Sequence, residues 1–168
     1  MKNVTLLALL GVALAVGSFA WAEHHGDEHQ AGWFDMGACE ICSPMAAHPE
    51  LMTEMQWETH KIDNGMLMVA LIPEKHQETF AGMCKMMKQK GKEIAASGKS
   101  AHLCGFCESF GQLTDAGAKE QIVETKFGNI TLVTATESAT VSKIHRHAER
   151  TQEEAKKMAE MMAQQYPQ

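Results

Sequence analysis

The chain has 168 residues and a formal net charge of −6, from 21 acidic and 15 basic side chains. An acidic balance argues against a nucleic acid as the partner, and the length suits one domain that can bury a core without disulfides. The five cysteines are an odd number, so even two disulfides would leave one thiol over.

The first 22 residues have the pattern of an export signal. Lys2 gives a positive start, residues 4–19 form an apolar run, and Ala20-Trp21-Ala22 places small residues where signal peptidase needs them. The run is too short for a stable span, and no later segment approaches the roughly 20 apolar residues that a span requires. We therefore expect a signal peptide over 1–22, no membrane insertion after cleavage, and secretion, most simply into a bacterial periplasm.

Residues 23–36 are predicted to be a flexible, His-rich N-terminal segment. Cleavage after Ala22 would leave a mature chain that begins Glu23-His24-His25. Its free amine, two amide nitrogens and the imidazole of His25 would suit a square-planar Cu(II) or Ni(II) site. We expect His24, His25 and His29 to gather metal ions. The alternative is an acidic, solvated leader in which the histidines have no role.

The first half of the predicted domain covers residues 37–99. It opens with Cys39-x-x-Cys42 and an apolar helical stretch, and Asp63-Asn64-Gly65 then predicts a hairpin turn between strands 57–62 and 66–72. A long helix is expected after Pro73, because apolar residues recur there at helical spacing. Those residues are Phe80, Met83, Cys84, Met87 and Ile94.

The second half, residues 100–168, repeats this order of features. Cys104-x-x-Cys107 opens a helix that is expected to stop at Gly117, and Gly128-Asn129 predicts a turn between strands 121–127 and 130–136. A last helix is expected from about 137 to 165. Each cysteine pair lies 65 residues from its counterpart (104 − 39 and 107 − 42), which favours an internal duplication.

The fold predicted from this pattern is a single α+β domain over residues 37–168. It consists of a duplicated helix–β-hairpin–helix unit whose hairpins merge into a four-stranded antiparallel sheet packed with helices, with pseudo-two-fold symmetry. The strand at 66–72 is apolar on both faces. It is therefore expected to be central, or to present its second face to a partner.

The two Cys-x-x-Cys pairs are the main chemical signal. Such a pair can ligate a soft metal through thiolates, cycle between dithiol and disulfide, or close as a structural bridge. Pseudo-symmetry could bring four sulfurs to one axis or give each half its own site. Further ligand candidates are Cys84, His102, His145 and His147, although a buried apolar cysteine and solvated histidines are the alternative reading.

Methionine offers a weaker indication of copper. Met36 and Met45 flank the first cysteine pair, and thioethers together with thiolates select Cu(I) over harder ions. Most methionines at helical spacing are nevertheless core or interface residues, including the group that closes the last helix.

Cys104-Gly105-Phe106-Cys107 resembles the dithiol motif of thioredoxin-like oxidoreductases. The resemblance covers the motif alone: those folds place a strand before the pair and a cis-proline facing it, whereas the order of elements here differs. Thiol–disulfide exchange is therefore kept as a third hypothesis.

The first hypothesis is an exported, soluble protein that binds copper or zinc for sequestration, delivery or sensing. Its site would use the two cysteine pairs and the His-rich terminus. The second is a structural or partner-binding module with local disulfides, which forms a homodimer or docks a protein through the sheet face or the Met-rich last helix. No arrangement typical of hydrolytic or phosphate chemistry stands out, so the sequence does not favour an enzyme.

Overall fold

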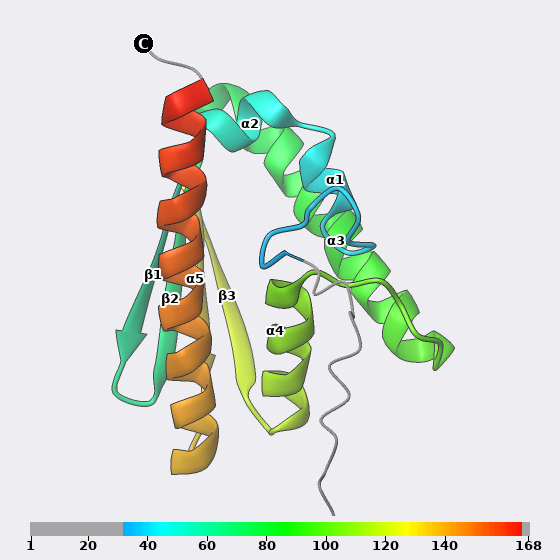
Figure 1. Ribbon diagram of the computed structural model, residues 1–168, viewed down its shortest axis with the longest axis vertical. Helices are drawn as coiled ribbons and strands as arrows, with labels where there is room; N and C mark the ends of the chain where they lie inside the picture. The colour runs from blue at the N-terminus through cyan, green and yellow to red at the C-terminus, as the bar shows by residue number, and fades with distance from the viewer. Residues whose placement is uncertain (1–31, 166–168) are drawn as a thin grey trace, which may run out of the picture.

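The computed structural model describes residues 32–165 (Figure 1). In chain order the elements are α1 (Ser43–Ala46), α2 (Pro49–Glu54), β1 (Gln56–Ile62), β2 (Gly65–Leu71), the 3₁₀ turn η1 (Glu74–His76), α3 (Gln77–Ser97), α4 (Gly105–Asp115), β3 (Lys119–Thr125), β4 (Gly128–Thr134) and α5 (Ser138–Gln165). The expected signal peptide and His24, His25 and His29 lie outside the described residues.

The strands form one antiparallel sheet in the order β1-β2-β4-β3. The two hairpins join through β2 and β4, which pair from Gly65 opposite Thr134 to Leu71 opposite Gly128. The predicted α+β class and four-stranded antiparallel sheet are confirmed. The apolar strand β2 is central, as one of the two readings of its sequence predicted.

The hairpins are built alike, because each joins two seven-residue strands and each second strand begins with glycine. A Cβ on Gly65 would collide with the carbonyl of Val133, and a Cβ on Gly128 would collide with that of Ala70. The two glycines are 63 residues apart (128 − 65), and so are the two carbonyls that they approach (133 − 70). The glycine of each hairpin therefore contacts the equivalent backbone position of the other hairpin. This arrangement is compatible with the predicted pseudo-two-fold relation.

The second hairpin turn was placed two residues too late by the sequence. It lies at Lys126-Phe127, and Gly128 already pairs with Thr125 as the first residue of β4. Gly128 has a φ of +138°, which side-chain-bearing residues rarely adopt. The glycine that resembled a turn residue is instead required at the start of the strand.

The helices before the two hairpins also differ. The apolar stretch after Cys42 forms the short helices α1 and α2, whereas α4 is one helix of 11 residues. The break comes at His48, with φ −129° and ψ 63°, directly before Pro49. A residue before proline is pushed out of the helical region by the proline ring.

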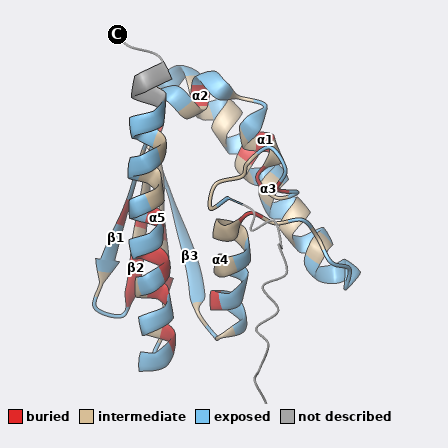
Figure 2. Ribbon diagram, viewed as in Figure 1, coloured by how far each residue is buried: buried red, intermediate tan, exposed pale blue. Residues whose placement is uncertain are grey.

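The helices cover one face of the sheet (Figure 1), and α5 contacts β1, β2 and β4. Side chains of β2 and β4 pack there against α4 and α5, and Figure 2 shows the buried part of β2 behind α5. This cluster contains Met66, Met68, Leu113, Val133, Ile144 and Ala148. A second cluster, Leu51, Ala70, Ile72 and Met83, joins the far end of β2 to α2 and α3.

The last residues of the expected flexible segment belong to the folded domain. Trp33 and Phe34 pack their rings on Phe106, and the carbonyls of Gly32 and Trp33 accept hydrogen bonds from Gly105 and Phe106 at the start of α4. The N–H groups of a first helical turn lack partners within their own helix, so this segment satisfies two of them. Within residues 32–165, none of the helices combines the length and apolarity that crossing a bilayer requires.

Candidate metal centre

Four cysteine sulfurs from the two halves of the chain meet at one place. The Sγ atoms of Cys39, Cys42, Cys104 and Cys107 all lie within 4.8 Å of one another. Cys39 and Cys104 are fully buried, Cys42 is 5% exposed and Cys107 is half-buried. Of the two arrangements that the sequence left open, the structure therefore has one shared site.

The first pair, Cys39 and Cys42, lies on a tight turn that leads into α1. Cys42 is the N-cap of that four-residue helix, and its N–H donates to the Sγ of Cys39 at 3.5 Å. The Cys39 N–H is bound to the carbonyl of Asp35, and its carbonyl accepts the N–H of Ser43. Short-range hydrogen bonds thus turn both sulfurs to the same side of the loop.

The second pair lies at the beginning of α4. Cys104 is the N-cap and Cys107 is in the first turn, so a spacing of three residues places both sulfurs at one end of the helix. The positive end of the helix dipole favours thiolate there. The backbone N–H of Cys107 helps to lower the pKa of the Cys104 thiol.

Glu40 and His102 join the two cysteine loops. The N–H of Glu40 donates to the carbonyl of His102 at 2.9 Å, and the N–H of His102 donates to Oε1 of Glu40 at 2.8 Å. Glu40 is adjacent to Cys39, and His102 lies two residues before Cys104. These bonds therefore fix the distance between the two cysteine pairs. The sequence reasoning assigned no role to Glu40 and considered His102 only for its ring.

The sulfur geometry is close to what a tetrahedral tetrathiolate site needs. A Zn–S bond of about 2.3 Å in a tetrahedron separates neighbouring sulfurs by roughly 3.8 Å. Cys42 and Cys104 are 3.8 Å apart, and Cys42 and Cys107 are 3.1 Å apart. A movement of less than 1 Å would bring the second pair to the tetrahedral spacing, and each of the five cysteines is unpaired.

The thiols influence one another strongly. Hydrogen bonds from Cys107 and Cys42 lower the pKa of Cys104, and they outweigh the opposing effect of burial. Hydrogen bonding to Cys104 in turn raises the pKa of Cys42 and of Cys107, with burial adding to the effect. The cluster can therefore stabilise one thiolate by itself. Four thiolates so close together need a cation to balance their charge.

Apolar side chains surround the sulfurs. Packed on the three buried cysteines are Met36, Ile41, Met45, Met87, Leu103 and Phe106. A soft ion would be shielded from water by this shell, and its four positions would be filled by protein. A site of that kind is closed, unlike catalytic zinc sites, which keep one position open.

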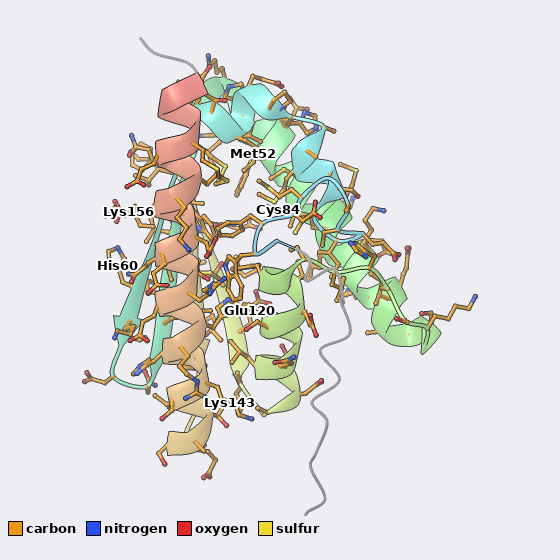
Figure 3. All side chains as sticks on the ribbon, viewed as in Figure 1. Met52, His60, Cys84, Glu120, Lys143 and Lys156 are labelled. Carbon is orange, nitrogen blue, oxygen red and sulfur yellow. The ribbon has the colours of Figure 1, made fainter. Side chains whose placement is uncertain are left out.

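The other proposed ligands of the folded domain lie outside this cluster, which contains no further His, Cys, Asp or Glu among the described residues. Cys84 is half-buried on α3 (Figure 3), where burial and the charge of Glu124 raise its pKa. His145 hydrogen-bonds the carbonyl of Ile62 at 2.9 Å, and His147 is bonded through Nδ1 to Ser109 Oγ at 2.9 Å. The His102 side chain is exposed.

Comparison of the chain with known protein families, with curated proteins and with solved structures finds no match. The chemistry of the site therefore has to be inferred from its own geometry, and that geometry is a buried cluster of four thiols compatible with metal binding or with disulfides.

Proposed function

We propose that the protein binds one zinc-type or copper(I) ion through Cys39, Cys42, Cys104 and Cys107. The observation that supports this most directly is the convergence of four sulfurs within 4.8 Å. Sulfur-only tetrahedral sites favour zinc, and soft Cu(I) also prefers thiolates. Zinc fits better, because a set of four cysteine sulfurs within 4.8 Å of one another matches its usual structural coordination.

The proposed role is sequestration of the ion outside the cytoplasm, and delivery and sensing are the alternatives. A buried site whose ligands all come from the protein favours tight binding of an ion. It leaves no coordination position open for catalysis on a substrate. The proposed export through residues 1–22 and ion capture by His24, His25 and His29 complete this picture. Both rest on the sequence alone.

Thiol–disulfide chemistry is the competing function. The sulfurs of Cys42 and Cys107 lie 3.1 Å apart, and this contact joins the two pairs. Oxidation would then link the halves of the chain. Exchange with another protein needs an accessible sulfur. Cys39, Cys42 and Cys104 are buried, which leaves the half-buried Cys107 as the sulfur of this cluster that a partner could reach.

The test is elemental analysis and thiol mass mapping of mature protein that is purified without oxygen. We expect one metal ion per chain and five reduced cysteines. Cys104→Ser should abolish stoichiometric metal binding, because a buried thiolate ligand is lost, while Cys84→Ser should retain it. A metal-free protein with two disulfides would refute the proposal, as would equal metal content in the two variants. Co(II) and Cu(I) loading would then distinguish the two ion types.

A further inference from the structure

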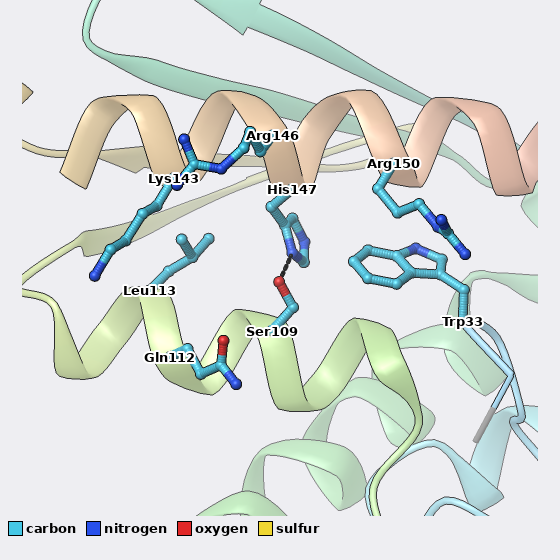
Figure 4. A pocket seen from close by; sticks show the side chains of 8 residues that line it. All are labelled: Trp33, Ser109, Gln112, Leu113, Lys143, Arg146, His147 and Arg150. Atoms are coloured by element: carbon cyan, nitrogen blue, oxygen red, sulfur yellow. Dashed lines mark hydrogen bonds between the residues drawn. The ribbon is translucent and has the colours of Figure 1, made fainter. Parts of the chain in front are cut away.

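A second site lies between α4 and α5, and none of the four cysteines lines it among the described residues. It is a cavity of about 310 Å³, lined by side chains of both helices and by Trp33 (Figure 4). Lys143, Arg146 and Arg150 contribute three cationic groups to it, and no acidic side chain of residues 32–165 lines it. This volume is at the lower end of the range for small-molecule pockets.

The spacing along α5 explains why these charges gather. Lys143, Arg146, His147 and Arg150 follow one another at steps of three, one and three residues, which places them on one helix face. The chain as a whole has a net charge of −6. The positive charge of this cavity is therefore a local feature, and the net charge of the chain does not predict it.

Two buried polar groups at this cavity lack partners among the described residues. They are Nε2 of His147, whose side chain is 3% exposed, and the indole N–H of Trp33. Figure 4 shows the two rings side by side, and their centroids are 5.3 Å apart. A buried polar group without a partner is costly, so such groups indicate a ligand or water that would satisfy them.

The hydrogen bonds determine what such a ligand would need. Burial lowers the pKa of His147 to about 4, so its ring is neutral near pH 7. When the Ser109 hydroxyl donates to Nδ1, the proton of the ring lies on Nε2, which then becomes a donor. Together with the indole N–H of Trp33, the pocket would offer two neutral donors and three cations, the complement of an oxyanion.

Nearby acids do not neutralise the cavity completely. Glu149 accepts from Lys61, and Glu154 is paired with both Lys157 and Arg150, the latter at 3.1 Å. Arg150 also lies over the ring of Trp33, 5.8 Å from its centroid. Within the described part of the chain, Lys143 and Arg146 have no salt-bridge partner.

We propose that this pocket binds a small organic oxyanion, a molecule with a phosphate or carboxylate group. A polyanion such as nucleic acid would need a wider positive surface than one cavity, and the acidic chain would repel it. Phosphate and carboxylate share the acceptor chemistry that Lys143, Arg146, Trp33 and His147 would recognise.

The test is NMR titration of the ¹⁵N-labelled, metal-loaded mature protein with inorganic phosphate, glycerol 3-phosphate and succinate at constant ionic strength. The indole N–H of Trp33 should shift with saturation. That of Trp57, which packs in the core clusters, should not and is the internal reference. Lys143→Gln combined with Arg146→Gln should weaken binding about tenfold or more, because two charged hydrogen-bond donors are lost.

The matched control is Lys88→Gln with Lys92→Gln, which removes the same charge from exposed positions of α3 and should leave affinity unchanged. Preserved amide shifts of the sheet would show that both variants fold. The proposal would be overturned if none of the three anions gave a saturable shift, or if both double variants weakened binding equally. Binding of the two phosphates alone, or of succinate as well, would support it and identify the preferred anion.

Discussion

The two cysteine pairs have the same spacing but different backbone support. Cys104 and Cys107 stand on the first turn of an 11-residue helix. Cys39 and Cys42 lie on a turn before a helix of only four residues. Helical geometry alone brings the second pair of sulfurs together, whereas the first pair depends on Asp35, Glu40 and the shared site. One pair is therefore largely preformed, and the other is completed by long-range contacts.

Removing the metal should separate the two pairs most clearly. In the metal-free, reduced protein we expect amide hydrogen exchange of residues 39–46 to accelerate about 100-fold, because their order depends on the site. Residues 109–115 should change far less, since α4 also packs on α5 through Leu113. Equal acceleration in both segments would show that α4 is no better preformed than the first loop.

The second half contains the buried histidine His147, and its burial predicts that the stability of the fold depends on pH. Burial lowers the pKa of His147 from 6.5 to about 4, so between these values the unfolded chain binds more protons than the folded one. Stability is thus greatest above pH 6.5 and falls as the pH drops toward 4, by on the order of 3 kcal/mol from this residue.

Urea unfolding at several pH values measures this effect as a difference between variants. His147→Gln should flatten the pH dependence relative to wild type, because it removes the imidazole whose pKa burial lowers. An identical slope in wild type and His147→Gln would mean that this imidazole is not the group that becomes protonated on unfolding.

The glycines that begin β2 and β4 test the symmetry of the hairpins. Gly128→Ala combines a φ of +138° with a collision at the Ala70 carbonyl, so we expect a loss of about 3 kcal/mol. Gly65→Ala should also destabilise, through the collision with Val133. Gly111→Ala, in open space within α4, should instead stabilise by about 0.5–1 kcal/mol, as thermal unfolding would reveal.

The smallest effect is expected at the link between the cysteine loops. Glu40→Ala removes the acceptor for the N–H of His102, and because that bond is exposed we expect a loss of about 1 kcal/mol, or roughly fivefold in metal affinity. Glu40→Gln retains an acceptor oxygen and serves as the control. Competition with a chelator measures the metal affinity of both variants. Equal affinities for the alanine variant and wild type would show that Glu40 does not contribute to metal binding.

Much of the fold follows from local patterns in the sequence. Asp63-Asn64-Gly65 predicted the first hairpin, although its turn is Asp63-Asn64 and Gly65 already belongs to β2. The apolar spacing after Pro73 predicted α3. The repeated order of features predicted the four-stranded sheet. These features depend on neighbours in the chain, so periodicity and turn chemistry were sufficient.

The errors come from residues whose role is set by distant parts of the chain. Gly128 resembles a turn residue, yet its backbone approaches Ala70 in another hairpin. Trp33 was expected in a flexible segment, but its carbonyl and ring are bound at the start of α4. The helical spacing of Lys143, Arg146 and Arg150 is visible in the sequence. The opposite wall of their cavity comes from α4, so the spacing alone does not predict the cavity.

By itself the sequence determined the two cysteine pairs and the hairpin that follows each, because these depend on local spacing. The turn that carries Cys39 and Cys42 was not among its predictions. Only the tertiary structure decided that the pairs form one site, that Cys84 and His147 lie apart from it, and that three cations share a cavity. The physical reason is that a site made from residues 62 or more positions apart depends on how β2 and β4 pair and how α4 and α5 pack, and spacing along the chain does not specify either.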